Sequence, residues 1–263
     1  MDYLAANHNF WQQNTDEHLK SDFYDLPAFL AGKTSLNHIE LELLGDISGK
    51  ELLHLQCHFG QDSLSLARMG AQVTGVDFSQ KAIAAAQDFN QKMGLNAQFL
   101  CSNVYDAPLH LAHKFDVVFA SYGTIGWLPD ISLWAKTVSH FLKPNGLFVF
   151  AEFHPFVWMY SNDFLRIEYH YHNHSPIVEA TQGSYANPSG SQTTTQITFN
   201  HSLSEVISAL VNSGLELEVF KEYNYSPYNC FQKTKQIAPN KYIIEPFGEK
   251  IPLVYALKLR KKN

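Results

Sequence analysis

The clearest chemical signal in the chain is a turn that is followed, about 20 residues later, by an acid. The turn is His54-Leu55-Gln56-Cys57-His58-Phe59-Gly60, after an apolar run, and the acid is Asp77, at the end of the next apolar run. This spacing is expected of a carboxylate that binds a ribose, because its two oxygens can accept both vicinal hydroxyl protons. Asp77 could instead only favour the start of the next helix through its charge, but the spacing favours ribose binding.

The side chains of the turn narrow the choice of ligand. A dinucleotide-binding turn has glycines at three positions, which let a pyrophosphate approach the helix N-terminus. Here Gly60 is present, but Gln56 and His58 stand where two of the glycines would fall. A pyrophosphate is therefore disfavoured, whereas a cofactor with a thioether or sulfonium arm and a zwitterionic tail needs less room.

Two histidines are candidate catalytic bases. His154 follows a predicted strand directly, and His201 precedes a capped helix, so both should lie at the active end of the sheet. A base is needed only if the reacting group must lose a proton. A histidine in such a place is more often structural than catalytic, and Glu152 could equally be a hydrogen-bond acceptor at the strand end.

Three alternating histidines raise the question of a metal site. His170, His172 and His174 would share one face of a strand, and three such side chains can ligate zinc in principle. Tyr169 and Tyr171 would fill the other face, so a solvent-exposed polar face explains the pattern as well. We therefore predict no metal site.

Short apolar runs alternate with helical patterns from residue 50 onwards. We predict strands at Glu51–Gln56, Gln72–Val76, Ala97–Cys101, Phe115–Ala120, Leu147–Glu152, Leu215–Lys221 and Leu253–Leu259. We predict helices at Asp62–Met69, at Ser79–Met93 with Ser79 as the N-cap, at Ile131–Leu142 and from the Ser202 capping box to Asn212. The pattern predicts an α/β, doubly wound fold with a seven-stranded, mostly parallel sheet. Ligands of such folds bind beyond the carboxyl ends of the strands.

Two segments interrupt this alternation. Residues 1–48 indicate an N-terminal helical extension, and residues 153–200 indicate an antiparallel β insertion between the two parts of the core, 49–152 and 201–263. We place the strands of the insertion at Arg166–His172 and Thr193–Phe199, on either side of the turn-rich Tyr185–Ser191, and expect the insertion to cover the carboxyl edge of the sheet.

The aromatic residues of the extension have two possible roles. Trp11, Phe23 and Tyr24 could close over a bound ligand as a lid, where aromatic faces would attract a sulfonium. They could equally pack the extra helix against the sheet, and both interpretations stay open at this point. Aromatic residues make up 14% of the chain, with 19 Phe, 13 Tyr and 4 Trp, and their concentration near the N-terminus and after residue 150 suggests a pocket for an organic ligand.

Composition limits the partners. The net charge of −6 and the scattered Lys and Arg argue against nucleic acid, and the basic tail Arg260-Lys261-Lys262 is best explained as a solvated terminus. No apolar run approaches the ~18 residues that span a membrane. Three widely spaced cysteines and the lack of a signal-like N-terminus predict a reduced, cytoplasmic location. Oligomeric state leaves no mark on the sequence.

In this order and at these spacings, the motifs resemble class I S-adenosylmethionine (SAM)-dependent methyltransferases. More narrowly, they resemble a bacterial-type branch with His-Leu-Gln-Cys-His-Phe-Gly in place of the usual acid-x-Gly-x-Gly-x-Gly. The resemblance covers almost the whole chain. Its blocks are Ser21–Asp25, Leu53–Ser65, Val73–Ser79, Asn103–Asp106, Phe115–Val118 and the turn Lys143-Pro144-Asn145-Gly146.

The resemblance implies roles for particular residues. The backbone of His58 and Gly60 would lie under the methionine part of SAM, Asp77 would bind the ribose hydroxyls, and Phe78 would pack on the adenine. Further residues implied to bind SAM are Asn103 and Val104 beside the adenine, and Ser121 and Tyr122 near the sulfonium. To these we add Trp11, Tyr24 and Ser79 as predicted SAM-binding residues. The family usually has an acid at the position of His54, and this acid orients the amino group of SAM. Because the residue here is a histidine, that role is not carried over to this chain.

The sequence thus predicts an enzyme that transfers a methyl group from SAM to a small organic molecule, by in-line attack on the sulfonium carbon. The extension and the insertion would form the acceptor pocket. Two other classes of function stay open. One is a SAM-binding protein without transferase activity, because no base is identified. The other is a nicotinamide-dependent oxidoreductase, which the missing glycines disfavour.

Overall fold

The computed structural model describes residues 2–187, 190 and 193–263. A seven-stranded sheet forms its centre. Its strands are β1 (Glu51–Leu55), β2 (Gln72–Asp77), β3 (Gln98–Cys101), β4 (Phe115–Ser121), β5 (Leu142–Phe153), β8 (Leu215–Tyr223) and β11 (Val254–Lys261). Two further hairpins are β6 (Ile177–Gln182) with β7 (Thr193–Thr198), and β9 (Thr234–Ala238) with β10 (Lys241–Ile244).

The strand order of the central sheet is β3-β2-β1-β4-β5-β11-β8. The pairs from β3 to β5 are parallel, whereas β11 runs antiparallel to both β5 and β8. The strands are added on one side of β1 as far as β3, and then on its other side from β4 onwards. The order of the strands therefore reverses at β1, which has β2 on one side and β4 on the other. This arrangement confirms the predicted doubly wound, mostly parallel fold.

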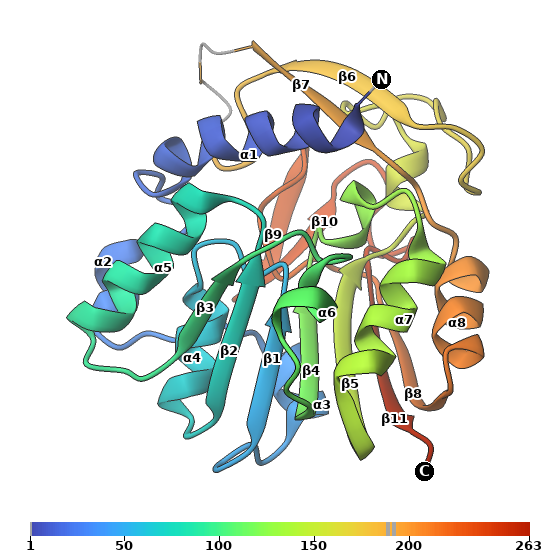
Figure 1. Ribbon diagram of the computed structural model, residues 1–263. Helices are drawn as coiled ribbons and strands as arrows, with labels where there is room; N and C mark the ends of the chain where they lie inside the picture. The colour runs from blue at the N-terminus through green and yellow to red at the C-terminus, as the bar shows by residue number, and fades with distance from the viewer. Residues whose placement is uncertain (1, 188–189, 191–192) are drawn as a thin grey trace.

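Helices cover both faces of the sheet (Figure 1). The α-helices of the described chain are α1 (Tyr3–His18), α2 (Leu26–Leu30), α3 (His38–Leu44), α4 (Gln61–Arg68), α5 (Gln80–Lys92), α6 (Ala107–His110), α7 (Ile131–Phe141) and α8 (Leu203–Asn212). The helices α3, α4 and α5 pack on one face, and α6, α7 and α8 pack on the other.

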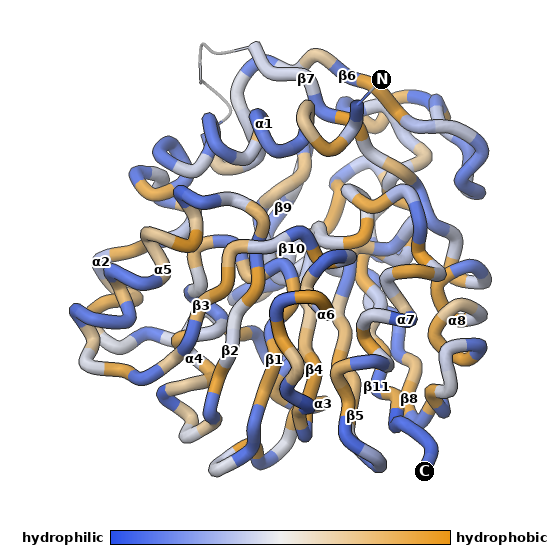
Figure 2. The backbone as a smooth tube through the Cα atoms, viewed as in Figure 1, coloured by the Kyte–Doolittle hydropathy of each residue, from blue (hydrophilic) through white to orange (hydrophobic). Residues whose placement is uncertain are grey.

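Alternating side chains of the central strands build two cores. In β1, Leu52 belongs to the core under α3 to α5, and Leu53 belongs to the core under α6 to α8. In β5, Phe148 belongs to the core under α6 to α8, and Val149 belongs to the core under α3 to α5. All four side chains are fully buried. Hydrophobic residues accordingly follow one another along β4 and β5 (Figure 2). Burial on both faces explains why the middle of each strand, Val117–Ala120 in β4 and Leu147–Ala151 in β5, is continuously apolar instead of alternating with polar residues.

The N-terminal helix and the insertion lie across the carboxyl ends of the strands (Figure 1). The side chain of Asn7 in α1 binds the backbone of Ile197 in β7 twice, donating from Nδ2 to the carbonyl at 2.8 Å and accepting the N–H at Oδ1 at 2.9 Å. An asparagine side chain therefore continues the strand pairing of β7. The contact joins two segments that are 190 residues apart in the chain.

One predicted strand of the insertion is wrong. The segment Arg166–His172 has only an isolated bridge, from Ile167 to Tyr160, and the strand that pairs with β7 is instead β6. Alternating side chains favour a strand, but a strand forms only when its backbone groups can pair with those of a neighbouring strand. Apart from the single bridge, Arg166–His172 has no such neighbour. The predicted strand Thr193–Phe199 is confirmed as β7, one residue shorter.

The remaining differences concern turns. The predicted turn at Lys143–Gly146 interrupts β5, where Asn145 has a φ of 61° and the register with β4 shifts. Part of the turn-rich stretch of the insertion, Pro188, Ser189 and Ser191, lies outside the described residues. The hairpin of β9 and β10 was not predicted, although Pro239-Asn240 between two short runs is a turn signal.

Gly60 gives a testable prediction about the turn after β1. Its φ is 79°, and an added Cβ would lie 2.9 Å from both Ala86 Cβ and Phe99 Cε1. We expect Gly60→Ala to lower the free energy of unfolding by about 2–4 kcal/mol, from left-handed strain and overpacking together. Urea denaturation measures this change.

The matched control is Gly94→Ala. Gly94 has a similar φ of 62°, but an added Cβ would meet no atom within 4 Å. This substitution should cost about 1–2 kcal/mol, from backbone strain alone. Equal losses in the two variants would show that the contacts with Ala86 and Phe99 do not constrain the turn.

Candidate functional site

The turn between β1 and α4 is held by a hydrogen bond to Asp77 at the end of β2. Oδ2 of Asp77 accepts the His58 N–H at 2.8 Å, and Oδ1 accepts the Ser79 N–H at 2.9 Å. Gln56 and His58 are both left-handed, with φ of 56° and 51°. The carboxylate thus joins the turns that follow β1 and β2, where the sequence predicted a ribose site.

Burial decides the charge of Asp77. The residue is 9% exposed, and desolvation raises the pKa of its carboxyl to about 6, against the opposing effect of the N–H groups of Ser79 and His58. At neutral pH the carboxyl is therefore mostly ionised, and it becomes protonated as the pH falls through 6. Each oxygen keeps capacity to accept a further hydrogen bond.

A cavity of about 1200 Å³ opens beside this turn, at the carboxyl ends of the strands. Most of the residues predicted to bind a cofactor line it together. They are Trp11, Tyr24, His58, Gly60, Asp77, Phe78, Asn103, Val104, Ser121 and Tyr122. The fold thus brings together in one cavity residues from the N-terminal extension, the turn after β1 and the ends of β2, β3 and β4.

Ser79 does not line the cavity. Its Oγ accepts the Ala82 N–H as the cap of α5, as the sequence predicted, and donates to Gln12 Oε1 in α1 at 2.9 Å. Ser79 therefore contacts the N-terminal helix instead of the cavity.

The two candidate bases differ in position. His154 does not line the cavity, and its ring accepts the Phe156 N–H at Nδ1 and pairs with Glu222 through Nε2 at 3.0 Å. His201 does line the cavity, but its Nε2 donates to the Leu128 carbonyl and its Nδ1 lies 3.0 Å from Glu205. Both rings therefore have partners at both nitrogens.

Glu152 is a hydrogen-bond acceptor at the end of β5. Its carboxylate accepts backbone N–H groups from Gly123, Thr124, Ile125 and Phe153. These bonds close the loop that follows β4 onto β5. The side chain therefore has the role of hydrogen-bond acceptor at the strand end that was considered from the sequence.

Two side chains of the turn have buried atoms without partners among the described residues. Gln56 donates from Nε2 to the Thr124 carbonyl at 2.8 Å, which leaves its Oε1 unpaired, and Nε2 of His58 is also unpaired. Both residues line the cavity. Buried polar atoms normally have partners, so these two atoms are where a ligand is expected.

Aromatic rings of α1 and of the loop after it surround His58. Its ring centroid lies 5.1 Å from Trp11, 5.4 Å from His18 and 5.6 Å from Tyr24. The Tyr24 hydroxyl lies 2.5 Å from the hydroxyl of Tyr185, which belongs to the insertion. Desolvation lowers the pKa of His18 to about 4 and that of His58 well below its usual range, so both rings are neutral at pH 7.

The position usually held by an acid has a different chemistry here. His54 Nδ1 lies 2.8 Å from Ser63 Oγ, and desolvation lowers the pKa of His54 to about 3. The ring is therefore neutral and paired within the protein. It does not supply the negative charge that an acid would.

Two carboxyl groups near the cavity were not found from the sequence: that of Glu40, which is fully buried, and that of Asp62, which lines the cavity. Glu40 in α3 accepts from the Tyr122 hydroxyl at 3.1 Å, and burial raises the pKa of Glu40 to about 8. Asp62 in α4 accepts from Ser35 and from Ser121 Oγ, and burial raises its pKa as well. Both acids hold residues at the end of β4, namely its last residue, Ser121, and the next residue, Tyr122. An acid on the apolar face of a helix, as at Glu40, was the signal that could have revealed this role.

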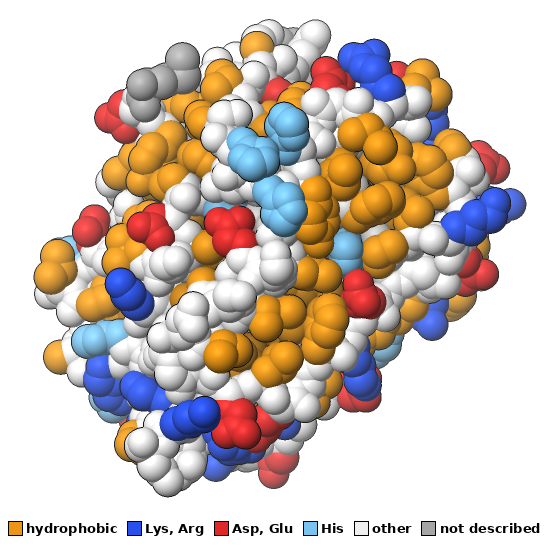
Figure 3. Space-filling model, turned by 90° about the vertical axis from the view of Figure 1, so that its right-hand side faces the viewer, with side chains coloured by type: hydrophobic (Ala, Val, Ile, Leu, Met, Phe, Trp, Pro, Cys, Tyr) orange, Lys and Arg blue, Asp and Glu red, His pale blue; other side chains and the backbone are white. Residues whose placement is uncertain are grey.

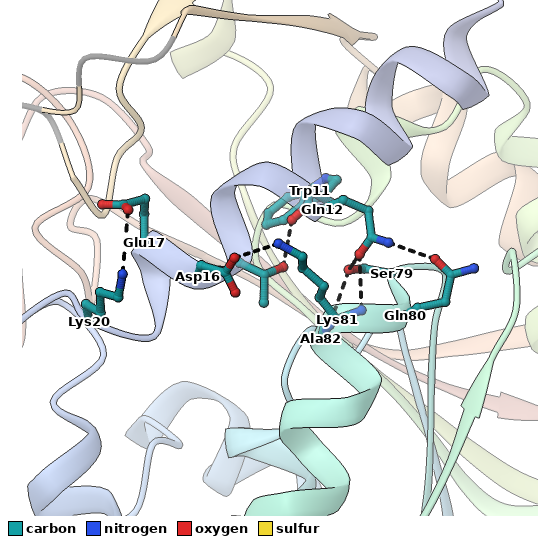
Figure 4. A network of polar contacts seen from close by, with 10 residues as sticks. Trp11, Gln12, Asp16, Glu17, Lys20, Ser79, Gln80, Lys81 and Ala82 are labelled. Carbon is teal, nitrogen blue, oxygen red and sulfur yellow. Dashed lines mark hydrogen bonds and ion pairs between the residues drawn. The ribbon is translucent and has the colours of Figure 1, made fainter.

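Gln12 is the centre of the contact between α1 and α5 (Figure 4). Its Oε1 accepts from Ser79 Oγ and from the Lys81 N–H, and its Nε2 donates to Gln80 Oε1 at 2.8 Å. One turn further along α1, Asp16 pairs with Lys81 at 2.5 Å. These bonds hold α1 over the turn that follows β2.

The alternating histidines lie at the surface. His170, His172 and His174 are exposed. The ring centroid of His174 lies 5.1 Å from that of His170 and 6.3 Å from that of His172. Histidine side chains gather on the face shown in Figure 3. Within the described ranges, no group of three or more His, Cys, Asp or Glu is arranged to hold a metal ion. Likewise, no helix of the described chain is long and apolar enough to cross a membrane.

Comparison with known proteins identifies the domain that contains the turn. A family model described as a methyltransferase domain matches residues 52–146. Residues 52–146 are thus similar to a methyltransferase domain. A curated relative, the ubiquinone biosynthesis O-methyltransferase of Coxiella burnetii, is 28% identical over 152 residues, which cover 53% of this chain and 63% of the relative. The match thus spans less than two thirds of the relative's own length.

Solved structures show the same fold. A SAM-dependent methyltransferase from Mesorhizobium loti has a TM-score of 0.55 at 19% identity, covering 90% of this chain and 98% of the other. A geranyl diphosphate C-methyltransferase from Streptomyces coelicolor, solved with S-adenosyl-L-homocysteine (SAH), has a TM-score of 0.56 at 14% identity, covering 84% and 76%. The methyltransferase domain therefore has the Rossmann-like methyltransferase fold.

The contact between α1 and α5 gives a second testable prediction. Gln12→Ala removes three hydrogen bonds that hold α1. We expect the backbone amides of α1 to exchange about tenfold faster with deuterium, because local opening becomes easier by roughly the value of one net hydrogen bond. The control is Gln13→Ala, an exposed neighbour on the same helix. Unchanged protection in Gln12→Ala would show that Asn7 and the aromatic contacts suffice to hold α1.

Proposed function

We propose that the protein is a SAM-dependent methyltransferase that acts on a small-molecule acceptor. The observation that carries the proposal is the Asp77 carboxylate, which lies at the end of β2 in the wall of the cavity and beside the turn of a methyltransferase domain. The printed names of the relatives support both the cofactor and the class of acceptor. We also propose that the chain belongs to the bacterial-type branch marked by its unusual turn.

The residues present fit SAM. Asp77 would accept the ribose hydroxyls, and Phe78, Asn103 and Val104 would enclose the adenine at the ends of β2 and β3. The unpaired atoms of Gln56 and His58 lie in the turn that would face the methionine part. Polar atoms of the zwitterionic tail would give these two atoms the partners that they lack within the protein.

The chemistry follows from position more than from acid–base groups. SAM, when bound, supplies a methyl group on a sulfonium carbon that is open to direct displacement. Ser121 and Tyr122 are held from below by Asp62 and Glu40, and we propose that they form the floor under this carbon. Transfer then requires an acceptor atom held in line, which positioning alone accelerates strongly.

The two histidines support the cavity in this proposal. A base is needed only for an acceptor that must lose a proton, and the nitrogens of His154 and His201 already have partners. We assign His201 to the cavity wall and His154 to the segment behind it. Any proton of the acceptor would then have to leave through another group or water.

We further propose that α1 is a lid. Trp11 and Tyr24 line the cavity, and the insertion and α5 hold α1 and the loop after it from opposite sides. A closed lid excludes water from the reacting groups.

The three cysteines form no disulfide in the described structure, and we propose a cytoplasmic location on that basis.

Asp77→Ala tests the proposal. Losing a charge-assisted contact to the ribose should weaken the binding of both SAM and SAH more than tenfold, or roughly 1.5–3 kcal/mol. Calorimetry with the two ligands measures the change. The control is Asp88→Ala, which removes an exposed aspartate of α5 that is paired with Lys92. Unchanged affinity in Asp77→Ala would contradict the ribose assignment, and SAM binding without transfer to any metabolite would favour a binding protein.

The pKa of Asp77 predicts how binding depends on pH. Its carboxyl has a pKa of about 6 and accepts hydrogen bonds from both hydroxyls only when ionised. The affinity for SAH should therefore fall as the pH decreases through 6, by about tenfold between pH 7 and pH 5, in proportion to the ionised fraction. Titrations at both pH values measure this ratio. In Asp77→Asn the ratio should approach one, and a wild-type affinity that is equal at both pH values would contradict the assignment.

A further inference from the structure

Two residues that line the cavity, away from the turn after β1, each have a buried polar atom without a hydrogen-bond partner among the described residues. These atoms are Oδ1 of Asn200, which is 3% exposed, and the hydroxyl of Tyr255, which is fully buried. Leaving such an atom unpaired costs roughly 1–3 kcal/mol. Buried polar groups are therefore usually paired, if necessary by a ligand or by water.

The hydrogen bonds of Asn200 fix which of its atoms is free. Its Nδ2 donates to the carbonyl of Pro155 at 3.1 Å and to that of His170 at 3.0 Å. A carbonyl oxygen cannot donate, so the amide nitrogen must face these two groups and Oδ1 must be the unpaired atom. Asn200 therefore presents a hydrogen-bond acceptor that needs a donor.

Tyr255 offers the complementary group. It lies opposite Glu152 in the pairing of β11 with β5, and Pro155, the partner of Asn200, follows Glu152 by three residues. Both unpaired atoms thus adjoin the segment that leaves β5. Burial and the Glu152 carboxylate raise the pKa of Tyr255 well above its usual range, so its hydroxyl keeps its proton and can donate it.

The charge of the wall limits what can bind. Of the described residues that line the cavity, Lys33 is the one Lys or Arg, and it is paired with Asp25 at 2.9 Å. The wall includes six carboxyl groups, those of Asp22, Asp25, Asp62, Asp77, Glu152 and Glu179. An anionic acceptor would be repelled and would find no free cation. Aromatic rings such as Phe153, Trp158 and Phe231 also line the cavity and suit an apolar molecule.

We infer that Asn200 and Tyr255 form an acceptor subsite that binds a hydroxyl group of an uncharged, largely apolar molecule. One hydroxyl satisfies both residues, because it donates to Asn200 Oδ1 and accepts from the Tyr255 hydroxyl. A carboxylate cannot donate to Asn200, and an ether cannot either. The inference rests on the proposed function in that the bound molecule is taken as the methyl acceptor.

The experiment compares two tyrosine variants. Tyr255→Phe removes the hydroxyl of the subsite, and Tyr223→Phe removes another buried hydroxyl that has no partner in the described chain and that does not line the cavity. Neither substitution breaks a side-chain hydrogen bond, so both variants should unfold thermally at the wild-type midpoint or slightly above it. This measurement shows that both variants are folded.

The probes are phenol, its methyl ether anisole, and benzoate, titrated calorimetrically into the protein saturated with SAH. Phenol should bind the wild type more tightly than anisole or benzoate. Tyr255→Phe should weaken phenol about five- to tenfold and leave anisole unchanged, because one hydrogen bond to the hydroxyl is lost. Tyr223→Phe should leave both affinities unchanged.

Several results would overturn the subsite. Benzoate or anisole binding as tightly as phenol would show that a hydroxyl is not selected, as would a failure of phenol to bind. An unchanged affinity for phenol in Tyr255→Phe would mean that a buried water pairs these atoms instead. The titrations with phenol, anisole and benzoate are repeated on the protein without SAH, which tests the subsite independently of the cofactor. A failure of SAH to bind then contradicts the proposed function and not the subsite.

Discussion

The hydrogen bonds between the Asp77 carboxylate and the backbone of two turns fix the geometry on which the rest of the site depends. One oxygen accepts the His58 N–H and the other accepts the Ser79 N–H, so the turn after β1 and the turn after β2 hold the same side chain. The left-handed backbone at Gln56 and His58 carries strain of about 1–3 kcal/mol per residue, which the surrounding contacts must offset. In return, both side chains project polar atoms into the cavity wall.

In both the floor and the roof of the cavity, polar side chains hold neighbouring segments by hydrogen bonds. Glu152 collects the N–H groups of the loop after β4, and Glu40 and Asp62 hold Tyr122 and Ser121 from below. In the roof, side chains of α1 bind the insertion and the start of α5. The buried contacts among these, such as the one between Asn7 and Ile197, are shielded from water and are therefore stronger than contacts at the surface.

The central sheet was predictable because burial on both faces requires continuous apolar strands, such as Leu147–Glu152, with helices between them. The position of Asp77 followed from the same pattern, and so did the Ser79 cap of α5, because both depend on local spacing. The insertion was predicted only in outline. Its strand at Arg166–His172 is replaced by β6, since alternation describes one strand and not its partner. The β9–β10 hairpin was missed because its two strands, Thr234–Ala238 and Lys241–Ile244, are too short to show a clear periodic pattern.

By itself, the sequence determined the doubly wound core, the turn with its following acid, and the absence of the glycines that a pyrophosphate requires. These features depend on residues close together in the chain, where periodicity and capping act directly. Only the tertiary structure decided that Gln12 contacts Ser79, that Glu40 supports Tyr122, and that the nitrogens of His154 and His201 already have partners. Those contacts join segments far apart in the chain, and local patterns do not encode which distant side chain completes a buried hydrogen bond.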